Sequence, residues 1–412
     1  MIDEKLFKRV ERRIHSYRKD MIELQTALCA APAIGPENGG EGEFLKAKLL
    51  EERLVKFGFP KIFRFDAPDD RVPSKIRPNL VVKINGRKPQ FVWIITHLDI
   101  VPPGELNLWS DSPYKAYVKK GKIFGRGVED NQQDMVASIF AARAILDEGI
   151  TPHYSIGLGF VADEETSGKK GLYHLVNSPN NPIGRRDMIV IPDSGNPQGT
   201  LIEITEKSML WLKFKTTGKQ CHGSNPHLGK NAFVAASHLV TELSQLKKFF
   251  PKTDRLFDPP QSTFEPTKKE SNVENINTIP GEDVFYMDCR VLPCYRLTDV
   301  MKAIKRIAGK IEKRFGVRVE ITPVHYLQAP KATPADAPVV RALEEAIAKV
   351  YGVKPFAGGV GAGTLAAYLR RQNYQAAVWS KTLQTAHQPD EHCSVADIIE
   401  NAKVFAYLFL RE

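Results

Sequence analysis

The sequence predicts an α/β protein with a parallel-stranded sheet and a smaller α+β insert. Short apolar runs, typical of buried strands, alternate with segments whose apolar residues recur at helical spacing. This pattern changes near residue 206, where a compact series of strands and helices begins, and the first pattern resumes near residue 327. The 412 residues, 42% of them hydrophobic, also exceed the roughly 100–200 residues of one typical domain.

The first domain is predicted to begin with helices and to continue with buried strands. Residues 3–29 and 41–57 carry apolar side chains at helical spacing, for example Leu6, Val10 and Ile14. Strands are expected at residues 79–84, 91–99, 154–163 and 187–193. A helical pattern over residues 130–149 lies between the second and third of these strands and ends at Gly149.

Polar side chains follow three of the four strands. His97 and Asp99 close the second strand, Asp163, Glu164 and Glu165 the third, and Asp193 the fourth. Asp130 opens the intervening helix, which is also the position of an N-cap residue. Because open α/β sheets bind ligands beyond the carboxyl ends of their strands, we expect these side chains to share one edge.

The insert and the return to the first domain show their own succession of elements. In the insert we expect strands at 208–216, 283–292 and 317–324, and helices at 231–246 and 297–315. After the insert we expect a helix at 336–351, a glycine-rich loop at 357–363, a helix from Thr364, a strand at 376–379 and a helix from Ser394. Strand–helix pairs with returning strands indicate a compact α+β unit.

Composition excludes several classes of protein. The formal charge of +10 comes from basic residues that are interleaved with Glu, as in EKLFKRVERR, so we expect solvated helix surfaces and no nucleic-acid partner. No run approaches the roughly 20 apolar residues of a membrane span, and the first residues do not resemble a secretory signal. The five cysteines are an odd, sparse set, which favours a reducing cytoplasm over a disulfide framework.

Five side chains are natural metal ligands: His97, Asp130, Glu165, Asp193 and His387. Nitrogen and oxygen donors without a thiolate suit zinc, cobalt or manganese. Two imidazoles and three carboxylates are too many for one open catalytic zinc, and they suit two ions that share a carboxylate. A single His or Asp at a strand end is more often a cap or a hydrogen-bonded loop residue. That interpretation would have to hold at all five positions together, which makes it improbable.

Six short motifs occur in an order that resembles the M20 metallopeptidase and amidohydrolase family. They are His97-Leu-Asp99-Ile-Val101-Pro102, Gly125-Arg126-Gly127-Val-Glu-Asp130, Asp163-Glu164-Glu165, Ile191-Pro-Asp193-Ser-Gly195, His222-Gly-Ser224 and His387-Gln-Pro389-Asp-Glu391. The family includes succinyl-diaminopimelate desuccinylase, acetylornithine deacetylase, aminoacylase, glutamate carboxypeptidase and carnosine-type dipeptidases. The resemblance implies a zinc-peptidase-like catalytic domain with a central mixed sheet, formed by residues 1–206 and 327–412. It also implies a ferredoxin-like lid and dimerisation domain at 207–326.

The resemblance assigns a role to each matched position around two metal ions, zinc or else cobalt or manganese. Asp130 would bridge them, and its peptide bond to Asn131 would be cis. His97 and Asp193 would complete one ion, and Glu165 and His387 the other. Asp99 would fix the tautomer of His97 from behind.

The catalytic groups follow from the same resemblance. Glu164 would be the general base that moves a proton from water to the leaving nitrogen. His222 would reach the active site of the partner subunit in a homodimer and stabilise the oxyanion.

Substrate recognition is expected from four further positions. Arg290 matches a family arginine that binds a substrate carboxylate, although a salt bridge to a neighbouring acid is the alternative. Asn275 is a candidate hydrogen-bonding residue, together with Asn277. The glycine-rich loop, with Gly361 and Thr364, would present backbone N–H groups to a carboxylate. The loop partly resembles a dinucleotide fingerprint, but no acidic ribose partner follows at the expected distance.

Two positions depart from the deacylase pattern. Asn-Gln-Gln follows Asp130 where deacylases commonly have Met-Lys-Gly, and Asp193 stands where desuccinylases usually have Glu. Aspartate is the usual residue in dipeptidases and aminopeptidases.

The predicted function is hydrolysis of an amide bond in a small peptide or an N-acyl amino acid, with peptidase and deacylase both open. The alternative is an inactive small-molecule-binding protein that retains the fold. The intact Glu164 and the five intact ligands argue against that alternative.

Overall fold

The computed structural model describes residues 2–412, which divide into two units. The first unit contains the chain up to Ile204, Thr333–Ala357 and Thr364–Glu412, and the second contains Thr205–Ala332 and Gly358–Gly363. These boundaries differ from the expected ones at 206 and 326 by a few residues and by the glycine-rich loop.

The first part of the predicted glycine-rich loop is strand β17 (Phe356–Val360), and Gly358–Gly363 belong to the second unit because of their hydrogen bonds. Arg290 Nη1 donates to the carbonyl oxygen of Gly361 at 2.8 Å. The N–H of Gly359 donates to the carbonyl oxygen of Leu256. These contacts are long-range in the sequence, so the pattern of helices and strands alone does not reveal them.

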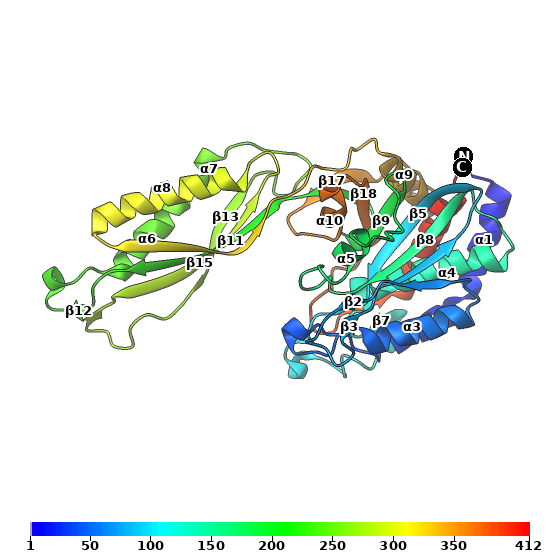
Figure 1. Ribbon diagram of the computed structural model, residues 1–412, viewed down its shortest axis with the longest axis horizontal. Helices are drawn as coiled ribbons and strands as arrows, with labels where there is room; N and C mark the ends of the chain where they lie inside the picture. The colour runs from blue at the N-terminus through cyan, green and yellow to red at the C-terminus, as the bar shows by residue number, and fades with distance from the viewer. Residues whose placement is uncertain (1) are drawn as a thin grey trace. The chain divides into compact units, whose positions relative to one another are not determined.

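The first unit is built on an eight-stranded mixed sheet in the order β1-β4-β8-β5-β9-β18-β10-β17 (Figure 1). The strands are β1 (Ile62–Arg64), β4 (Leu80–Ile84), β5 (Lys88–His97), β8 (Tyr154–Val161), β9 (Met188–Asn196), β10 (Leu201–Glu206), β17 (Phe356–Val360) and β18 (Ala376–Lys381). Strands β8, β5, β9 and β18 run parallel to their neighbours in this series. This confirms the α/β class and the buried strands expected near residues 79–84, 91–99, 154–163 and 187–193.

Short strands and turns complete the two units. The strands are β2 (Ala67–Pro68), β3 (Ile76–Arg77), β6 (Tyr117–Lys119), β7 (Lys122–Phe124), β12 (Cys221–His222), β14 (Thr278–Ile279) and β19 (His392–Ser394). Short 3-10 turns are η1 (Pro36–Asn38), η2 (Leu106–Leu108) and η4 (Pro226–Leu228).

Helices cover both faces of the large sheet. They are α1 (Glu4–Ser16), α2 (Arg18–Cys29), α3 (Phe44–Lys56), α4 (Gln133–Asp147), α5 (Leu172–Val176), α9 (Pro338–Tyr351), α10 (Ala366–Arg371) and α11 (Val395–Leu410). Along β5, Val92 and Ile94 pack into the core with α4 and α11, whereas Trp93 and Ile95 pack into the core with α5 and α10. Burial on both faces explains why this strand is a continuous apolar run.

Helix α4 begins at Gln133 and not at Asp130. A π-helical turn, η3 (Val128–Gln132), precedes it, and no side chain caps its N-terminus. The N-cap interpretation of Asp130 is therefore wrong, because its carboxylate oxygens face two histidines instead. The peptide bond between Asp130 and Asn131 is cis, as the family resemblance implies.

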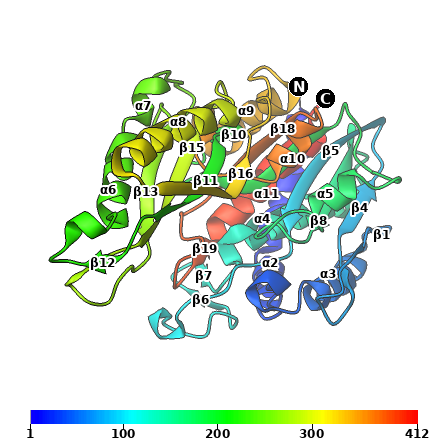
Figure 2. The same ribbon diagram turned by 60° about the vertical axis from the view of Figure 1, so that its left-hand side comes forward.

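The second unit contains a four-stranded antiparallel sheet in the order β13-β15-β11-β16, with two main helices (Figure 2). Its elements are β11 (Ser208–Thr217), α6 (Ala232–Leu243), α7 (Leu246–Phe249), β13 (Thr263–Lys269), β15 (Glu282–Val291), α8 (Leu297–Phe315) and β16 (Arg318–Leu327). Disregarding the one-turn helix α7, the strand–helix–strand–strand–helix–strand order is ferredoxin-like. Strand β13 is absent from the sequence-based expectation because it is an edge strand with exposed, charged positions such as Lys268.

Within residues 2–412, no helix has both the length and the apolar character needed to cross a bilayer.

A buried ion pair joins α10 to β10 inside the first unit. Arg370 Nη1 lies 2.6 Å from Glu203 Oε1, and both side chains are 1% exposed. Nη2 of the same guanidinium donates a hydrogen bond to the carbonyl oxygen of Ala376 at 3.1 Å. Desolvation of both charges makes the pair sensitive to the loss of one partner.

Arg370→Met should destabilise the protein by about 3–5 kcal/mol, because it leaves a buried carboxylate without its cation. The matched control is Lys349→Met, which removes an exposed pair with Glu4 and should cost less than about 1 kcal/mol. Denaturant unfolding of the two variants measures the difference. Similar losses in the two variants would contradict the assignment.

Candidate metal centre

The side chains expected at the carboxyl ends of the strands lie together in the first unit. His97 is the last residue of β5, Asp193 lies in β9, and Glu164 and Glu165 follow β8 in a turn. Asp130 comes from the π-helical turn η3 and His387 from the loop before β19. Five proposed ligands and the proposed base therefore come from six separate positions in the sequence and meet at one edge of the sheet.

Asp130 lies between the two histidines. Its Oδ1 is 3.0 Å from His97 Nε2, and its Oδ2 is 3.0 Å from His387 Nε2. Each carboxylate oxygen thus faces a different imidazole, which is the arrangement that a carboxylate shared by two ions requires.

Each imidazole has a second carboxylate beside it. His97 Nε2 lies 3.1 Å from Asp193 Oδ1, and His387 Nε2 lies 3.2 Å from Glu165 Oε2. Two donors bound to one zinc ion lie roughly 3.3–3.6 Å apart at a tetrahedral angle, so only a small adjustment separates these spacings from those of a metal site. Ligand atoms of His97, Asp130 and Glu165 all lie within 4.8 Å of one another. The donor set and its spacing fit divalent cations.

The electrostatics of the cluster reflect an excess of carboxylates. Hydrogen bonds to Asp130 and Glu165 raise the pKa of His387 to about 10. Burial and the charge of Asp130 raise the pKa of Glu165 to about 7. Although burial opposes it, hydrogen bonds from His387 and His97 keep the pKa of Asp130 below its usual range. The side chains thus favour positive charge at the positions between them, which a divalent cation also supplies.

Glu164 has the environment of a proton-transfer group. Ligand atoms of Glu164, His97 and Asp193 lie within 4.8 Å of one another. Burial, followed by the charge of Asp193, raises the pKa of Glu164 well above its ordinary value. Perturbed carboxylates of this kind occur at catalytic sites.

Asp99 contacts both His97 and the backbone of the two glutamates. Its carboxylate accepts hydrogen bonds from the backbone N–H groups of Glu164 and Glu165, both at 3.0 Å. His97 Nδ1 lies 3.0 Å from the main-chain oxygen of Asp99, and 3.6 Å from the nearer carboxylate oxygen. Asp99 therefore lies behind His97 with both its main-chain oxygen and its carboxylate, and its carboxylate also positions the backbone of both glutamates.

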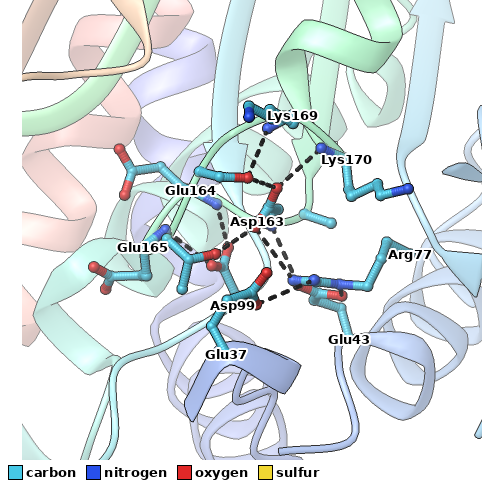
Figure 3. Close-up of polar contacts among 12 residues, drawn as sticks. Glu37, Glu43, Arg77, Asp99, Asp163, Glu164, Glu165, Lys169 and Lys170 are labelled. Atoms are coloured by element: carbon cyan, nitrogen blue, oxygen red, sulfur yellow. Dashed lines mark hydrogen bonds and ion pairs between the residues drawn. The ribbon is translucent and has the colours of Figure 1, made fainter. Parts of the chain in front are cut away.

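A buried network beneath the glutamates was not expected from the sequence. Figure 3 shows Glu164 and Glu165 with their side chains pointing away from a cluster of Asp99, Asp163, Arg77 and Glu43. Arg77 forms a short ion pair with Glu43, which also accepts the N–H of Asp163 at 3.2 Å.

Asp163 shapes the turn that carries the glutamates. It has a φ of +62° and accepts hydrogen bonds from Ser167 Oγ at 2.7 Å and from the N–H of Lys170 at 2.9 Å. The side chains of Arg77, Glu43 and Asp163 are fully buried, so this network fixes the turn from below (Figure 3).

Two buried glutamates hold the loops of Asp130 and His387 against each other. Glu391 accepts hydrogen bonds from the N–H groups of Glu129 at 2.9 Å and Asp130 at 3.2 Å, and pairs with Arg126 at 2.7 Å. In return, Glu129 accepts the N–H of Ala386 at 2.8 Å. Both glutamates stand within the quoted motifs, but their spacing gives no indication of this reciprocal arrangement.

Asn131 is a further residue that the sequence interpretation missed. Its Nδ2 donates to Asp193 Oδ1 at 2.7 Å, and its Oδ1 accepts the N–H of His97 at 3.2 Å. Deacylases commonly have Met at this position, so the departure noted in the sequence places an amide where it can orient a ligand.

The remaining candidates do not join this cluster within the first unit. His222, Asn275, Arg290 and Gly361 belong to the second unit. His222 is an exposed residue of the short strand β12, and its Nδ1 lies 2.8 Å from Ser224 Oγ. The Nδ2 of Asn275 donates to Asn277 Oδ1 at 2.6 Å.

The side chains of Arg290 and Thr364 both have partners inside the protein. The guanidinium of Arg290 pairs with Asp288 through Nε at 2.8 Å and Nη2 at 2.9 Å, which is the alternative interpretation of this residue. The hydroxyl of Thr364 is buried and lies 3.4 Å from Glu203 Oε2.

Comparison with known proteins places these observations in a family. The family model "Peptidase family M20/M25/M40" matches residues 93–411. An uncharacterized metallohydrolase of Methanocaldococcus jannaschii is 37% identical over 401 residues, covering 94% of this chain and 98% of the relative. Succinyl-diaminopimelate desuccinylase of Pelagibacter ubique is 25% identical over 392 residues, covering 93% and 97%.

A solved structure shares the fold. Human carnosine dipeptidase 1 aligns with a TM-score of 0.76 over 98% of both chains, at 16% identity. Since the family model covers most of the chain and a relative is 37% identical along nearly all of it, the protein belongs to peptidase family M20/M25/M40 and is a metal-dependent hydrolase of amide or peptide bonds.

Proposed function

We propose that the protein is a dinuclear hydrolase, with two zinc ions or else cobalt or manganese, that cleaves one amide bond in a small peptide or an N-acyl amino acid. The observation that supports it best is the position of Asp130, with one oxygen 3.0 Å from each of two imidazoles. His97 and Asp193 would hold one ion, His387 and Glu165 the other, and Asp130 both.

The residues around the proposed ions have separate tasks. Divalent cations held by these residues would lower the pKa of a water molecule and polarise the substrate carbonyl group. Glu164 would take a proton from the attacking water and give it to the leaving nitrogen. Asp99 holds the backbone of Glu164 through a hydrogen bond at 3.0 Å, which keeps the base in place during both transfers.

Two observations bear on the substrate class, and they support different substrates. The desuccinylase relative acts on an N-acyl amino acid, as its name says, whereas aspartate at position 193 is the residue of the dipeptidase branch. We therefore retain both a dipeptidase or carboxypeptidase and a deacylase. Burial raises the pKa of Glu164 well above its ordinary value, as is common for catalytic carboxylates. This favours an active enzyme over an inactive binding protein.

We also propose a homodimer formed through the second unit. Phe233 and Val234 on α6 are 44% and 42% exposed, and β13 is an edge strand of the sheet. A groove of about 390 Å³ lies between α6 and β13 and includes Phe233, Val240 and Lys268 among its lining residues. An apolar helix face beside an unpaired strand edge suits pairing with a second copy.

Metal analysis should find two divalent ions per chain after chelation and reloading. Asp130→Asn should lose most of both, because the bridging carboxylate is weakened, whereas Asp193→Asn should retain about one. Asp20→Asn, which changes a partly exposed carboxylate paired with Arg143, is the control and should retain both. A stoichiometry of one in the unaltered protein would contradict the dinuclear proposal.

Glu164→Gln should abolish turnover while metal content and fold remain intact, because Glu164 moves protons and is not a proposed ligand. We expect a loss greater than the roughly 10²–10⁴-fold typical of one acid–base group, since water activation and nitrogen protonation both depend on it. Steady-state kinetics on a set of dipeptides and N-acyl amino acids measures the effect. Glu52→Gln on the exposed face of α3 is the control, and near-normal turnover by Glu164→Gln would overturn the assignment.

Complementation tests whether His222 acts across the dimer. Mixing inactive His222→Ala chains with inactive Glu164→Ala chains should restore activity, because one site of each mixed dimer has an intact metal centre and an intact His222. Random pairing gives about a quarter of the original activity.

The matched control for this experiment is His227→Ala, another exposed histidine close to His222 in the sequence, which should remain active. Mixed dimers without activity, or a fully active monomer, would show that the cross-subunit role is wrong.

A further inference from the structure

The side-chain amide of Asn131 joins two of the proposed ligands. Its Nδ2 donates a hydrogen bond to Asp193 Oδ1 at 2.7 Å, and its Oδ1 accepts the backbone N–H of His97 at 3.2 Å. The residue before it in the chain is Asp130, the carboxylate that both ions would share. One planar group therefore ties the turn η3 to the end of β5 and to β9, at the three residues that would hold one ion.

The two neighbours of this amide determine its orientation. The N–H of His97 requires an acceptor, and the carboxylate of Asp193 requires a donor. Exchanging the oxygen and the nitrogen of the amide would set two donors against each other on one side and two acceptors on the other. Asn131 is 1% exposed, so each of these groups would be buried without a partner, which is costly. The amide therefore keeps its N–H group directed at Asp193.

Asn131 is the donor that remains for Asp193 when a cation is bound. Within residues 2–412, the partners of the Asp193 carboxylate are His97 Nε2 at 3.1 Å and Asn131 Nδ2. The Nε2 of His97 is a proposed ligand atom, and a nitrogen that binds a cation uses its lone pair and has no proton to donate. Hydrogen-bond partners behind a ligating carboxylate fix its direction. Asn131 can do so without neutralising the charge that attracts the cation, because an amide is uncharged.

The other proposed ion has no such amide beside it. Its own two ligands, Glu165 and His387, contact each other and Asp130. In the part of the chain that the structure describes, no further side chain donates a hydrogen bond to the Glu165 carboxylate, and Asp99 holds only its backbone N–H. Removal of the Asn131 amide should therefore weaken one ion and spare the other.

We propose that Asn131 is a positioning residue that directs Asp193 toward the ion it would share with His97. The inference rests on the proposed function and deepens it, because it assigns to one of the two ions a group that is itself no ligand. Asn131 acts on that ion through Asp193 and contributes nothing to the ion of Glu165 and His387.

Removal of the amide tests the inference. Asn131→Leu preserves the approximate size of the side chain and removes both hydrogen bonds. Calorimetric titration of the chelated protein with zinc should show an affinity about 10–100-fold lower for one ion and changed by less than about threefold for the other. Asn131→Ala, which removes the amide without adding apolar bulk, should give the same selective loss. Unchanged affinities, or equal losses for both ions, would overturn the inference.

Asn181→Leu is the matched control. Asn181 makes the same two kinds of hydrogen bond, because its Nδ2 donates to Tyr374 Oη at 2.8 Å and its Oδ1 accepts the N–H of Ile183 at 3.0 Å. Neither partner is a proposed ligand, so both zinc affinities should remain as in the unaltered protein. A loss in this variant as large as in Asn131→Leu would show that the effect is general and would contradict the assignment.

A double-variant cycle tests whether Asn131 acts through Asp193. Asp193→Asn should retain the ion of Glu165 and His387. Adding Asn131→Leu to that variant should change its zinc affinity by less than about threefold, because the carboxylate that the amide directs is already gone. A further loss of about tenfold or more would mean that Asn131 acts by another route, and it would overturn the proposal.

The metal dependence of turnover distinguishes positioning from a defect of the fold. In Asn131→Leu, the zinc concentration that gives half-maximal activity should rise about 10–100-fold, while turnover at saturating zinc recovers most of its original value. A misfolded site would not be repaired by added zinc, so a persistent loss of turnover would contradict the positioning role. Two bound zinc ions without any turnover by the unaltered protein would overturn the proposed hydrolysis, whereas the selective loss in the titrations would still support the role of Asn131.

Discussion

The contact on which the site depends is that of Asp130 with two imidazoles from distant parts of the chain. Its oxygens lie 3.0 Å from His97 and from His387, which are 290 residues apart in the sequence. The carboxylate can face both imidazoles only if the end of β5, the turn η3 and the loop before β19 are held firmly relative to one another. Much of the polar structure in the first unit serves this requirement.

Buried charges under the site provide that precision. Glu391 holds the backbone of Asp130, and Glu129 holds the loop that leads to His387. Asp99 fixes the turn of Glu164 and Glu165 from one side, while Asp163 fixes it from another. Carboxylates that accept several backbone N–H groups are well suited to this task, because charge-assisted hydrogen bonds are strong and directional. The proposed metal ligands are therefore supported by groups that are not themselves proposed ligands.

The sequence by itself determined the class of fold and the family, and it named the five proposed ligands and the proposed base, which the folded chain brings together. Strand ends carry these residues, and apolar periodicity locates strands such as β5 and β9 within a few positions. Local pattern failed where contacts between distant residues decide the outcome. Helix α4 begins after Asp130 because that side chain faces histidines, and β13 is too charged to be recognised as a strand.

Only the tertiary structure decided how the ligands are held and what else they touch. The roles of Glu129, Glu391, Arg77 and Asn131 depend on hydrogen bonds between distant segments, such as that of Asn131 with Asp193 at 2.7 Å. Likewise, only the folded chain shows that the side chain of Arg290 pairs with Asp288 and that the hydroxyl of Thr364 lies beside Glu203. A sequence motif shows which side chains are present. Packing decides which of their donors and acceptors remain free, because a group that makes a hydrogen bond inside the protein is no longer available to a ligand.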